Sequence, residues 1–357
     1  MICSISPTAP WILFFSLGLY AHCQIVSVEC LQFDPSCNPW AGQLLFTRSS
    51  AQATVPVLVA VGDSGQAFYS RDKGQTWESS GSTGVGVVLN EVAQDPGGNF
   101  LAVGDSGTII TGWNPKSLTW SVISIGATGL GGLAIGSGAD GQTYRVATGP
   151  NEVWYSVDGQ NWNPNSALSG LTAIRKAEYA LGKFIVVGND GSSEVTATST
   201  TPESSWDVPD NLPVGAASYQ RMTTFNGRII ILESGLAITI GAYSSDGKNW
   251  IDIGNGGGGG QNRLFGVACS TTLCVAVGGA GGAEGATSTD GINWNSFMIT
   301  GPSLMADIVF LDGQFISVGS LGKAYISADG SDGSWQTITV DPGSSNLKAI
   351  ALGYVNP

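Results

Sequence analysis

Five aspartates recur in nearly the same short sequence, and repeated carboxylates are a residue type that cation binding or acid–base catalysis would need. Each aspartate lies two residues after a serine and is followed by a glycine and, further on, by a tryptophan. Copy by copy, these residues are Ser70, Asp72, Gly74 and Trp77; Ser156, Asp158, Gly159 and Trp162; Ser244, Asp246, Gly247 and Trp250; Ser288, Asp290, Gly291 and Trp294; and Ser327, Asp329, Gly330 and Trp335.

Local hydrogen bonding explains this motif without a catalytic role. An aspartate in a tight turn accepts hydrogen bonds from backbone N–H groups of its own turn, and a serine hydroxyl adds another. Glycine supplies the positive φ that the turn requires, and tryptophan covers the hairpin with a large apolar ring. We therefore predict that all five motifs are structural and that each joins the third strand of a repeat to the fourth.

Four other acidic residues fall at equivalent positions, directly after the second strand of a repeat. They are Asp63, Asp105, Asp190 and Glu233. If the repeats superpose, these side chains form a partial acidic ring near a central channel, where they could receive a cation or a basic segment of a partner. Turn chemistry is the alternative, because aspartate in a Gly-Asp-Ser-Gly turn also bonds its own backbone.

The sequence lacks the residues needed for Ser–His hydrolysis and for phosphate or dinucleotide binding. The sole histidine, His22, lies in an apolar N-terminal segment, and no Gly-x-Ser-x-Gly elbow is present, so Ser–His hydrolysis in its usual form is not expected. Phosphate-binding and dinucleotide-binding glycine motifs are absent as strand–turn–helix units, and we expect the glycine run 256–260 to be a surface loop. The sequence therefore predicts no cofactor and no metal site.

Two of the six cysteines indicate the redox compartment. Cys269 and Cys274 bracket a four-residue loop between two apolar runs, which is typical of a hairpin with a disulfide at its base. A disulfide would indicate an oxidising compartment. Metal binding is the competing interpretation, but the mature chain offers no histidine to complete a ligand set.

The elements that must position these residues come from an internal repeat. Seven tryptophans, at 77, 120, 162, 206, 250, 294 and 335, are spaced 41 to 44 residues apart. Between them, short apolar strands alternate with glycine-containing turns, and no helical period is visible. Four short strands per repeat of this length are typical of a propeller blade. We predict an all-β, seven-bladed β-propeller over residues 55–357.

The two ends of the repeat region predict how the ring closes. The first repeat begins at Val57 with a second-strand sequence and lacks its innermost strand, whereas residues 347–352 (LKAIAL) follow the last repeat and begin no further one. We expect 347–352 to pair with 57–61 and complete blade one, so that no sheet edge stays open.

The N-terminus indicates export. Residues 11–21 form an apolar run of signal-peptide length that is too short to span a bilayer. We assign 1–22 to a signal peptide and 23–54 to a flexible tether. Cys23 is a candidate for lipid acylation, with Cys30 as the alternative, and residues 30–39 resemble the tether of spirochaete-type lipoproteins. An ordinary secreted protein, with a Cys30–Cys37 disulfide, is the other interpretation.

Charge restricts the partners. The 357 residues carry a net charge of −13, and only 11% of residues are charged. Nucleic acids and anionic lipid surfaces need clustered lysine and arginine, so neither is expected as a partner. A membrane is expected only through an N-terminal lipid, and we expect a monomer.

The repeated Ser-x-Asp-x-Gly-x-x-Trp motif resembles that of the Asp-box, or bacterial neuraminidase repeat, propellers. This family includes sialidases, xyloglucan-cleaving glycosidases, sortilin-like receptors and photosystem II assembly factors. The phrase Ala-Val-Gly-Asp-Ser-Gly, at 60–65 and 102–107, is most similar to the assembly-factor type. The resemblance implies a seven-bladed propeller whose Asp-boxes lie away from the active face.

Two functions remain open. A sialidase-like enzyme would need an arginine triad, and this chain has seven arginines, of which Arg48 and Arg71 lie in the tether and in an Asp-box turn. We therefore predict a non-enzymatic, extracytoplasmic binding propeller, secreted or lipid-anchored at the cell surface, that takes a protein or glycan on its loop face. A glycoside hydrolase using two carboxylates on that face is the alternative.

Overall fold

The computed structural model describes residues 54–207, 212, 218–234, 241–254, 263–279 and 282–356. The predicted signal peptide, Cys23, Cys30, Cys37 and all but the last residue of the tether lie outside these residues, as does the glycine run 256–260. Within the described part, the chain contains no helix with the length and apolar character needed to cross a membrane.

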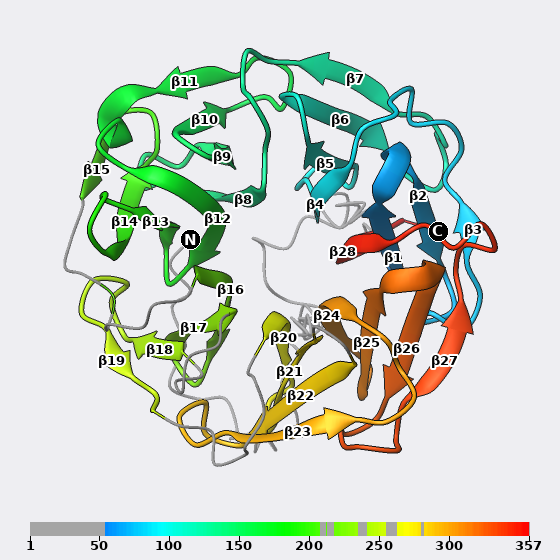
Figure 1. The fold of residues 1–357 in the computed structure, drawn as a ribbon. Coiled ribbons are helices and arrows are strands. Elements are labelled where there is room, and N and C mark those ends of the chain that lie inside the picture. Colours follow the sequence, from blue (N-terminus) through cyan, green and yellow to red (C-terminus); the bar gives the residue numbers. More distant parts are fainter. Residues whose placement is uncertain are drawn as a thin grey trace, which may run out of the picture. The chain divides into compact units, whose positions relative to one another are not determined.

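The described residues form seven four-stranded antiparallel sheets arranged as the blades of a ring, which confirms the predicted seven-bladed propeller (Figure 1). From the inner to the outer edge, blades 1 to 4 contain β28 (Leu347–Val355), β1 (Val55–Gly62), β2 (Ala67–Ser70) and β3 (Glu78–Ser79); β4 (Leu89–Gln94), β5 (Phe100–Gly104), β6 (Thr108–Trp113) and β7 (Ser121–Ser124); β8 (Gly132–Ser137), β9 (Thr143–Gly149), β10 (Glu152–Ser156) and β11 (Asn163–Asn165); and β12 (Thr172–Ala180), β13 (Lys183–Asn189), β14 (Glu194–Thr201) and β15 (Ser205–Asp207).

The remaining three blades repeat the same order. They contain β16 (Ser218–Phe225), β17 (Arg228–Ser234), β18 (Gly241–Ser244) and β19 (Ile251–Asp252); β20 (Leu264–Cys269), β21 (Cys274–Gly279), β22 (Ala283–Ser288) and β23 (Asn295–Ile299); and β24 (Met305–Leu311), β25 (Gln314–Gly319), β26 (Lys323–Ser327) and β27 (Gln336–Thr339). Three short 3-10 turns, η1 (Asp63–Gly65), η2 (Ser166–Leu168) and η3 (Ser320–Gly322), complete the described elements.

The strands differ in burial according to their place in the blade. Every residue of β5 and of β21, both second strands, is buried, because a second strand is covered on both faces by the neighbouring blades. Their sequences, FLAVG and CVAVGG, are accordingly continuous runs without a charged or polar residue. The outermost strand β3 is fully exposed. This gradient explains why the second strands give the clearest pattern in the sequence.

The hydrophobic core is divided among the interfaces between blades. Each of the seven apolar clusters joins two adjacent blades; one, for example, joins blades 1 and 2 through Val59, Phe100 and Trp113. No blade therefore buries its two faces alone, and the stability of each one depends on its neighbours.

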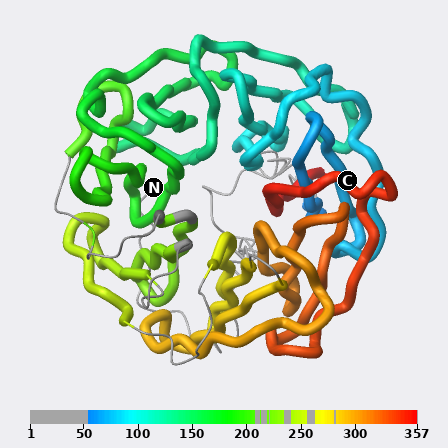
Figure 2. Tube along the Cα trace, viewed as in Figure 1, coloured from blue at the N-terminus to red at the C-terminus, as the bar shows by residue number. Residues whose placement is uncertain are grey.

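The ring closes through both ends of the described chain, as predicted. β28 pairs antiparallel with β1, and Leu58 lies opposite Leu352 and Val61 opposite Ala349. Figure 2 shows the last segment of the chain in red beside the first strand in blue. Because β28 supplies the innermost strand of blade 1, no blade is left with three strands.

Candidate functional site

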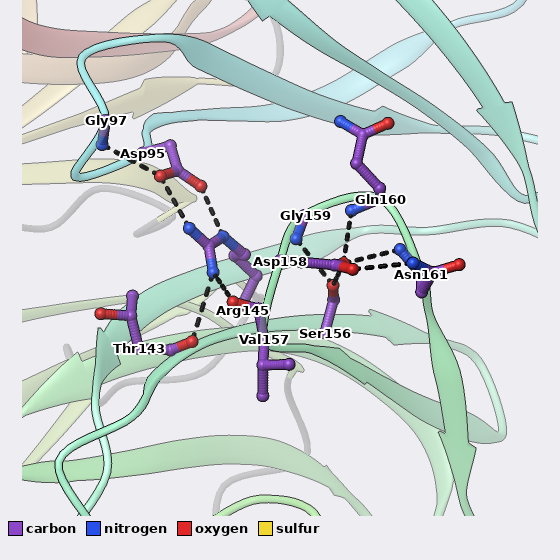
Figure 3. A network of polar contacts seen from close by, with 10 residues as sticks. All are labelled: Asp95, Gly97, Thr143, Arg145, Ser156, Val157, Asp158, Gly159, Gln160 and Asn161. Atoms are coloured by element: carbon purple, nitrogen blue, oxygen red, sulfur yellow. Dashed lines mark hydrogen bonds and ion pairs between the residues drawn. The ribbon is translucent and has the colours of Figure 1, made fainter.

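The Asp-box carboxylates are used within their own turns. In the blade 3 turn, the Asp158 carboxylate accepts hydrogen bonds from the N–H groups of Gln160 and Asn161 at 2.8 and 2.7 Å, and the Ser156 hydroxyl accepts one from Gly159 at 2.8 Å (Figure 3). The bonds from Asn161 contribute most to a pKa of Asp158 well below its usual range. A carboxylate that is ionised and saturated in this way is poorly suited to proton transfer, which favours a structural role.

The same contacts recur in the other four motifs. The serine hydroxyl accepts a hydrogen bond from the motif glycine at 2.8 to 2.9 Å in each of them. The aspartate accepts from downstream backbone N–H groups in all four, and its pKa is lowered in each. These contacts are those expected of the motif, although they do not by themselves assign the chain to the Asp-box family.

The motif glycines also lie against the preceding blade. A Cβ atom added at Gly330 in blade 7 would lie 2.5 Å from the Val275 side chain in blade 6, and one at Gly291 would lie 2.6 Å from Ile230 in blade 5. In blade 3 the place of the aliphatic neighbour is taken by an ion pair, in which Arg145 binds both carboxylate oxygens of Asp95 from blade 2 (Figure 3). Each turn therefore joins two blades as well as two strands.

The structure does not gather the four other predicted acidic residues into one site. Asp63 forms an ion pair with Lys348 at 3.6 Å, and Asp105 accepts a hydrogen bond from Asn90. Asp190 accepts bonds from the N–H groups of its own turn at Ser192 and Ser193, and Glu233 is completely buried in β17. Turn chemistry thus accounts for Asp190, and the acidic ring stays a prediction that this arrangement does not favour.

Cys269 and Cys274 lie directly opposite each other at the end of the β20–β21 hairpin. Their Cα atoms are 4.0 Å apart and their sulfur atoms 2.00 Å apart. The two cysteines therefore lie close together, and both the disulfide and the oxidising compartment stay predictions.

A hollow of the described surface lies at one mouth of the central channel. It has a volume of about 630 Å³ and is lined from the first strand, or the loop before it, of every blade. The loops after the second strand also reach it, at Asp105, Pro150 and Ser320, so these loops and the links between blades share one face. We call this hollow the mouth pocket.

The charges that line the mouth pocket are mostly positive. Arg175, Lys176, Arg221 and Lys348 line it together with a single carboxylate, that of Asp105. Apolar side chains, including those of Leu130, Ile174, Phe265 and Leu304, complete the wall. Each of the four cations is ion-paired to a carboxylate that does not line the pocket; Arg175, for example, binds Glu194 at 2.7 Å. The pocket therefore combines paired cations with apolar surface, whereas the sequence had suggested an acidic surface.

An ion-pair cluster forms the floor of the mouth pocket. Arg221, on β16, binds Glu91 on β4 and, at 2.6 Å, Asp307 on β24; Lys176, on β12, binds Glu91 at 2.9 Å. Asp307 also accepts the backbone N–H of Ile350 on β28 at 3.0 Å. The cluster therefore connects blades 1, 2, 4, 5 and 7 across the channel. We call Glu91, Lys176, Glu178, Arg221 and Asp307 the floor cluster.

Burial gives the carboxyl groups of the floor cluster unequal pKa values. Burial raises the pKa of Glu178, on β12, to about 8, although Arg221 acts in the opposite direction. Burial likewise raises the pKa of Asp307 to about 6. For Glu91 the burial effect is outweighed by Arg221 and Lys176, and its pKa is lowered. The cluster therefore holds Glu91 ionised and Glu178 protonated at neutral pH.

Sequence reasoning missed the floor cluster, although a signal was present. Glu91 and Asp307 each stand third in a first strand that is otherwise largely apolar. A charged residue inside an inward-facing strand must find a partner. The partners could not be named, because Glu91 is 85 residues from Lys176 and 130 from Arg221.

Comparison with known proteins supports the fold. No family model and no curated protein matches the sequence. Among solved structures, the chain is similar to YCF48 bound to D1 peptide (TM-score 0.53, 13% identity, 75% of this chain and 93% of that chain) and to YCF48 from Cyanidioschyzon merolae (0.52, 13%, 74% and 94%). It is also similar to the WD40 β-propeller domain of Doa1 (0.55, 14%, 74% and 89%). At these identities the likeness shows the propeller fold alone.

Proposed function

We propose that this protein is a non-enzymatic binding propeller whose mouth pocket receives an acidic segment of a partner protein. The observation that carries the proposal is the number of lysine and arginine side chains that line that pocket. Four of the chain's 14 lysines and arginines line it, in a protein whose net charge is −13. Each of these cations is already ion-paired, but an anionic group entering the mouth can compete for them, because Asp105 is the one carboxylate among the lining residues.

The hydrogen-bonding states of Arg221 and Lys348 differ in what they leave for an anionic ligand. Its two terminal nitrogens bind Glu91 and Asp307, whereas its buried Nε–H has no acceptor among the described residues. A buried donor without an acceptor costs free energy. Lys348 lies higher in the wall, with 41% of its side chain exposed, and its contact with Asp63 is long at 3.6 Å. Lys348 therefore has hydrogen-bonding capacity left for a ligand, whereas the Nε–H of Arg221 has no exposed surface through which a ligand could reach it.

The apolar wall favours a peptide over a small anion. Leu130, Ile174, Phe265 and Leu304 could cover two or three apolar side chains of an extended segment. A propeller neighbour also supports this class of ligand, since one YCF48 structure is described as bound to D1 peptide. We therefore expect the partner segment to combine acidic and apolar residues. The glycan alternative lacks a comparable observation.

The hydrolase alternative has a definite structural requirement. It needs two carboxyl groups about 5–10 Å apart on the loop face, and the mouth pocket is lined by one, that of Asp105. Glu91 and Glu178 do line a common hollow, but it lies further along the first strands, on the other side of Arg221. This placement favours binding over hydrolysis.

The proposed location is extracytoplasmic, with the chain secreted as a monomer or anchored through a lipid on Cys23 or Cys30. The placement of Cys269 opposite Cys274 supports an oxidising compartment. Mass spectrometry of the mature protein from its host would show signal cleavage at the predicted position, any acyl group and the state of the cysteine pair.

Binding is tested with a capped, fluorescein-labelled peptide of three Leu-Glu repeats, and with the matching Leu-Gln peptide as the uncharged control. Fluorescence anisotropy should detect the acidic peptide at least tenfold more tightly than the control. Lys348→Glu reverses one wall charge and should weaken binding about tenfold, which corresponds to about 1.4 kcal/mol. Lys323→Glu, on β26 and outside the pocket, should change it little. Equal affinity for both peptides would contradict the proposal.

A further inference from the structure

The floor cluster separates the mouth pocket from a second hollow in the channel. This lower hollow, of about 280 Å³, is lined by later residues of the first strands, including Glu91, Glu178 and Ile350. Lys176 lines the mouth pocket, Glu91 and Glu178 line the lower hollow, and Arg221 lines both. The cations thus lie between the two hollows. A ligand would approach them from the mouth pocket, and the carboxylates of Glu91 and Asp307 bind them as ion pairs.

The charges of the cluster do not balance when every group is ionised. Glu91, Glu178 and Asp307 would carry three negative charges against the two positive charges of Lys176 and Arg221. Ion pairs join Glu91 and Asp307 to the cations, whereas no described residue forms a hydrogen bond or an ion pair with the Glu178 carboxyl group. One proton on Glu178 makes the cluster neutral.

Among the described residues, the titratable and charged groups around Glu178 come from four strands. β4 contributes Glu91, β12 contributes Lys176 and Tyr179, β16 contributes Arg221 and β24 contributes Asp307. The Tyr179 hydroxyl donates to the Ser137 carbonyl, and β8 and β28 line the lower hollow with apolar residues. Burial holds the Glu178 pKa near 8, and Glu91 and Asp307 add to this, against the opposing effects of Arg221 and Lys176.

We propose that the floor cluster couples ligand binding to a proton: an anionic segment binds at the mouth together with a proton on Glu178, and the segment is released as the pH rises and Glu178 ionises. This inference rests on the proposed function and names its regulation. A ligand carboxylate near Lys176 and Arg221 adds a negative charge that partly offsets the stabilisation of ionised Glu178 by these two cations. The negative charge on Glu178 then becomes less favourable, and one proton is taken up from solvent.

The proton balance gives a quantitative expectation. When Glu178 is already protonated, binding takes up no proton and the affinity is independent of pH. When Glu178 is ionised, binding takes up one proton, and the affinity falls by up to tenfold for each pH unit. For the Leu-Glu peptide, whose own carboxylates stay ionised above neutral pH, we expect the main rise of Kd above pH 8, where Glu178 ionises. Asp307, with a pKa of about 6, adds a separate and smaller change near pH 6 that Glu178→Gln should retain.

The decisive variant is Glu178→Gln, which keeps the shape of the side chain and removes its titration. Anisotropy from pH 6 to 9.5 should give a profile that is flat above pH 7 for this variant and a falling affinity for the parent. Calorimetry at pH 8.5 in phosphate and in Tris, whose ionisation enthalpies differ, should detect uptake of up to one proton by the parent and of much less by the variant. Asp105→Asn removes a carboxylate from the wall outside the cluster and should change Kd by the same factor at every pH.

The outcomes separate the two proposals. Tight, selective peptide binding with no pH dependence and no proton uptake would overturn this inference and leave the proposed function standing. An unchanged pH profile in Glu178→Gln would also overturn it, since the loss would then come from another group such as Lys176, whose pKa is lowered by burial. Absence of selective peptide binding at every pH would overturn both.

Discussion

Glu178 has a chemical environment that the repeat pattern of the sequence does not predict. It stands in a first strand, near two cations that are already paired, and burial raises its pKa to about 8. Replacing a buried charge cluster with apolar residues often leaves a protein equally stable or more stable. Stability alone therefore does not explain the presence of this cluster in the channel, which agrees with the binding role that we propose for it.

The raised pKa predicts a pH-dependent stability that can be measured without a ligand. Between pH 4.5 and about 8 the folded protein retains a proton on Glu178 that the unfolded chain releases, so this residue makes stability fall as pH rises through that window. Glu178→Gln should be more stable than the parent at pH 9, by about 1.4 kcal/mol or more, the equivalent of one pKa unit. Urea unfolding at pH 5, 7 and 9 measures the difference, and a gap that stays constant over this range would contradict the assignment.

At the residue scale, the sequence predicted the turn residues better than the site residues. Asp158 and its counterparts act within a few residues of their own position, so their chemistry could be worked out from local spacing. Glu91, Lys176 and Arg221 meet only because the ring brings three blades together. Asp105 lines the mouth pocket, but the sequence did not reveal the four cations that line it as well.

At the scale of elements, the Asp-box turn joins neighbouring blades, a role that its own sequence does not reveal. Within a repeat, the motif predicts a hairpin between the third and fourth strands, and the hydrogen bonds of Ser327 and Asp329 agree with this. The contact of Gly330 with Val275 in the preceding blade depends on how blades pack. A glycine at this place is needed for space as well as for its backbone angle.

Two glycines of the blade 7 turn allow the need for space to be measured apart from the need for a positive φ. Gly330 and Gly333 both have positive φ, 72° and 78°, so alanine is strained at either position. An alanine Cβ at position 330 would lie 2.5 Å from Val275, whereas at 333 it would meet nothing within 4 Å. Gly330→Ala should therefore cost about 1–3 kcal/mol more than Gly333→Ala, because only the former overpacks the interface. Chemical denaturation of both variants measures this, and equal losses would argue against the contact between blades.

At the scale of the whole molecule, the spacing of seven tryptophans and the unmatched strands at the two ends were sufficient to predict the ring and its closure. β28 and β1 pair as expected because a repeat that begins with its second strand leaves one place to be filled. The ring in turn creates what no repeat contains, a pocket lined from all seven blades. The ligand site could not be predicted for that reason.

The most direct test of the account is to map where the Leu-Glu peptide lies on the ring. A photo-crosslinking amino acid is placed at Phe265, in the wall of the mouth pocket, or at Leu181, an exposed residue of the turn that joins β12 to β13 on the other face. Illumination with the labelled peptide should give a crosslink at position 265 that excess unlabelled peptide abolishes, and none at 181. Equal crosslinking at both positions, or a crosslink at 181 alone, would contradict binding at the mouth pocket.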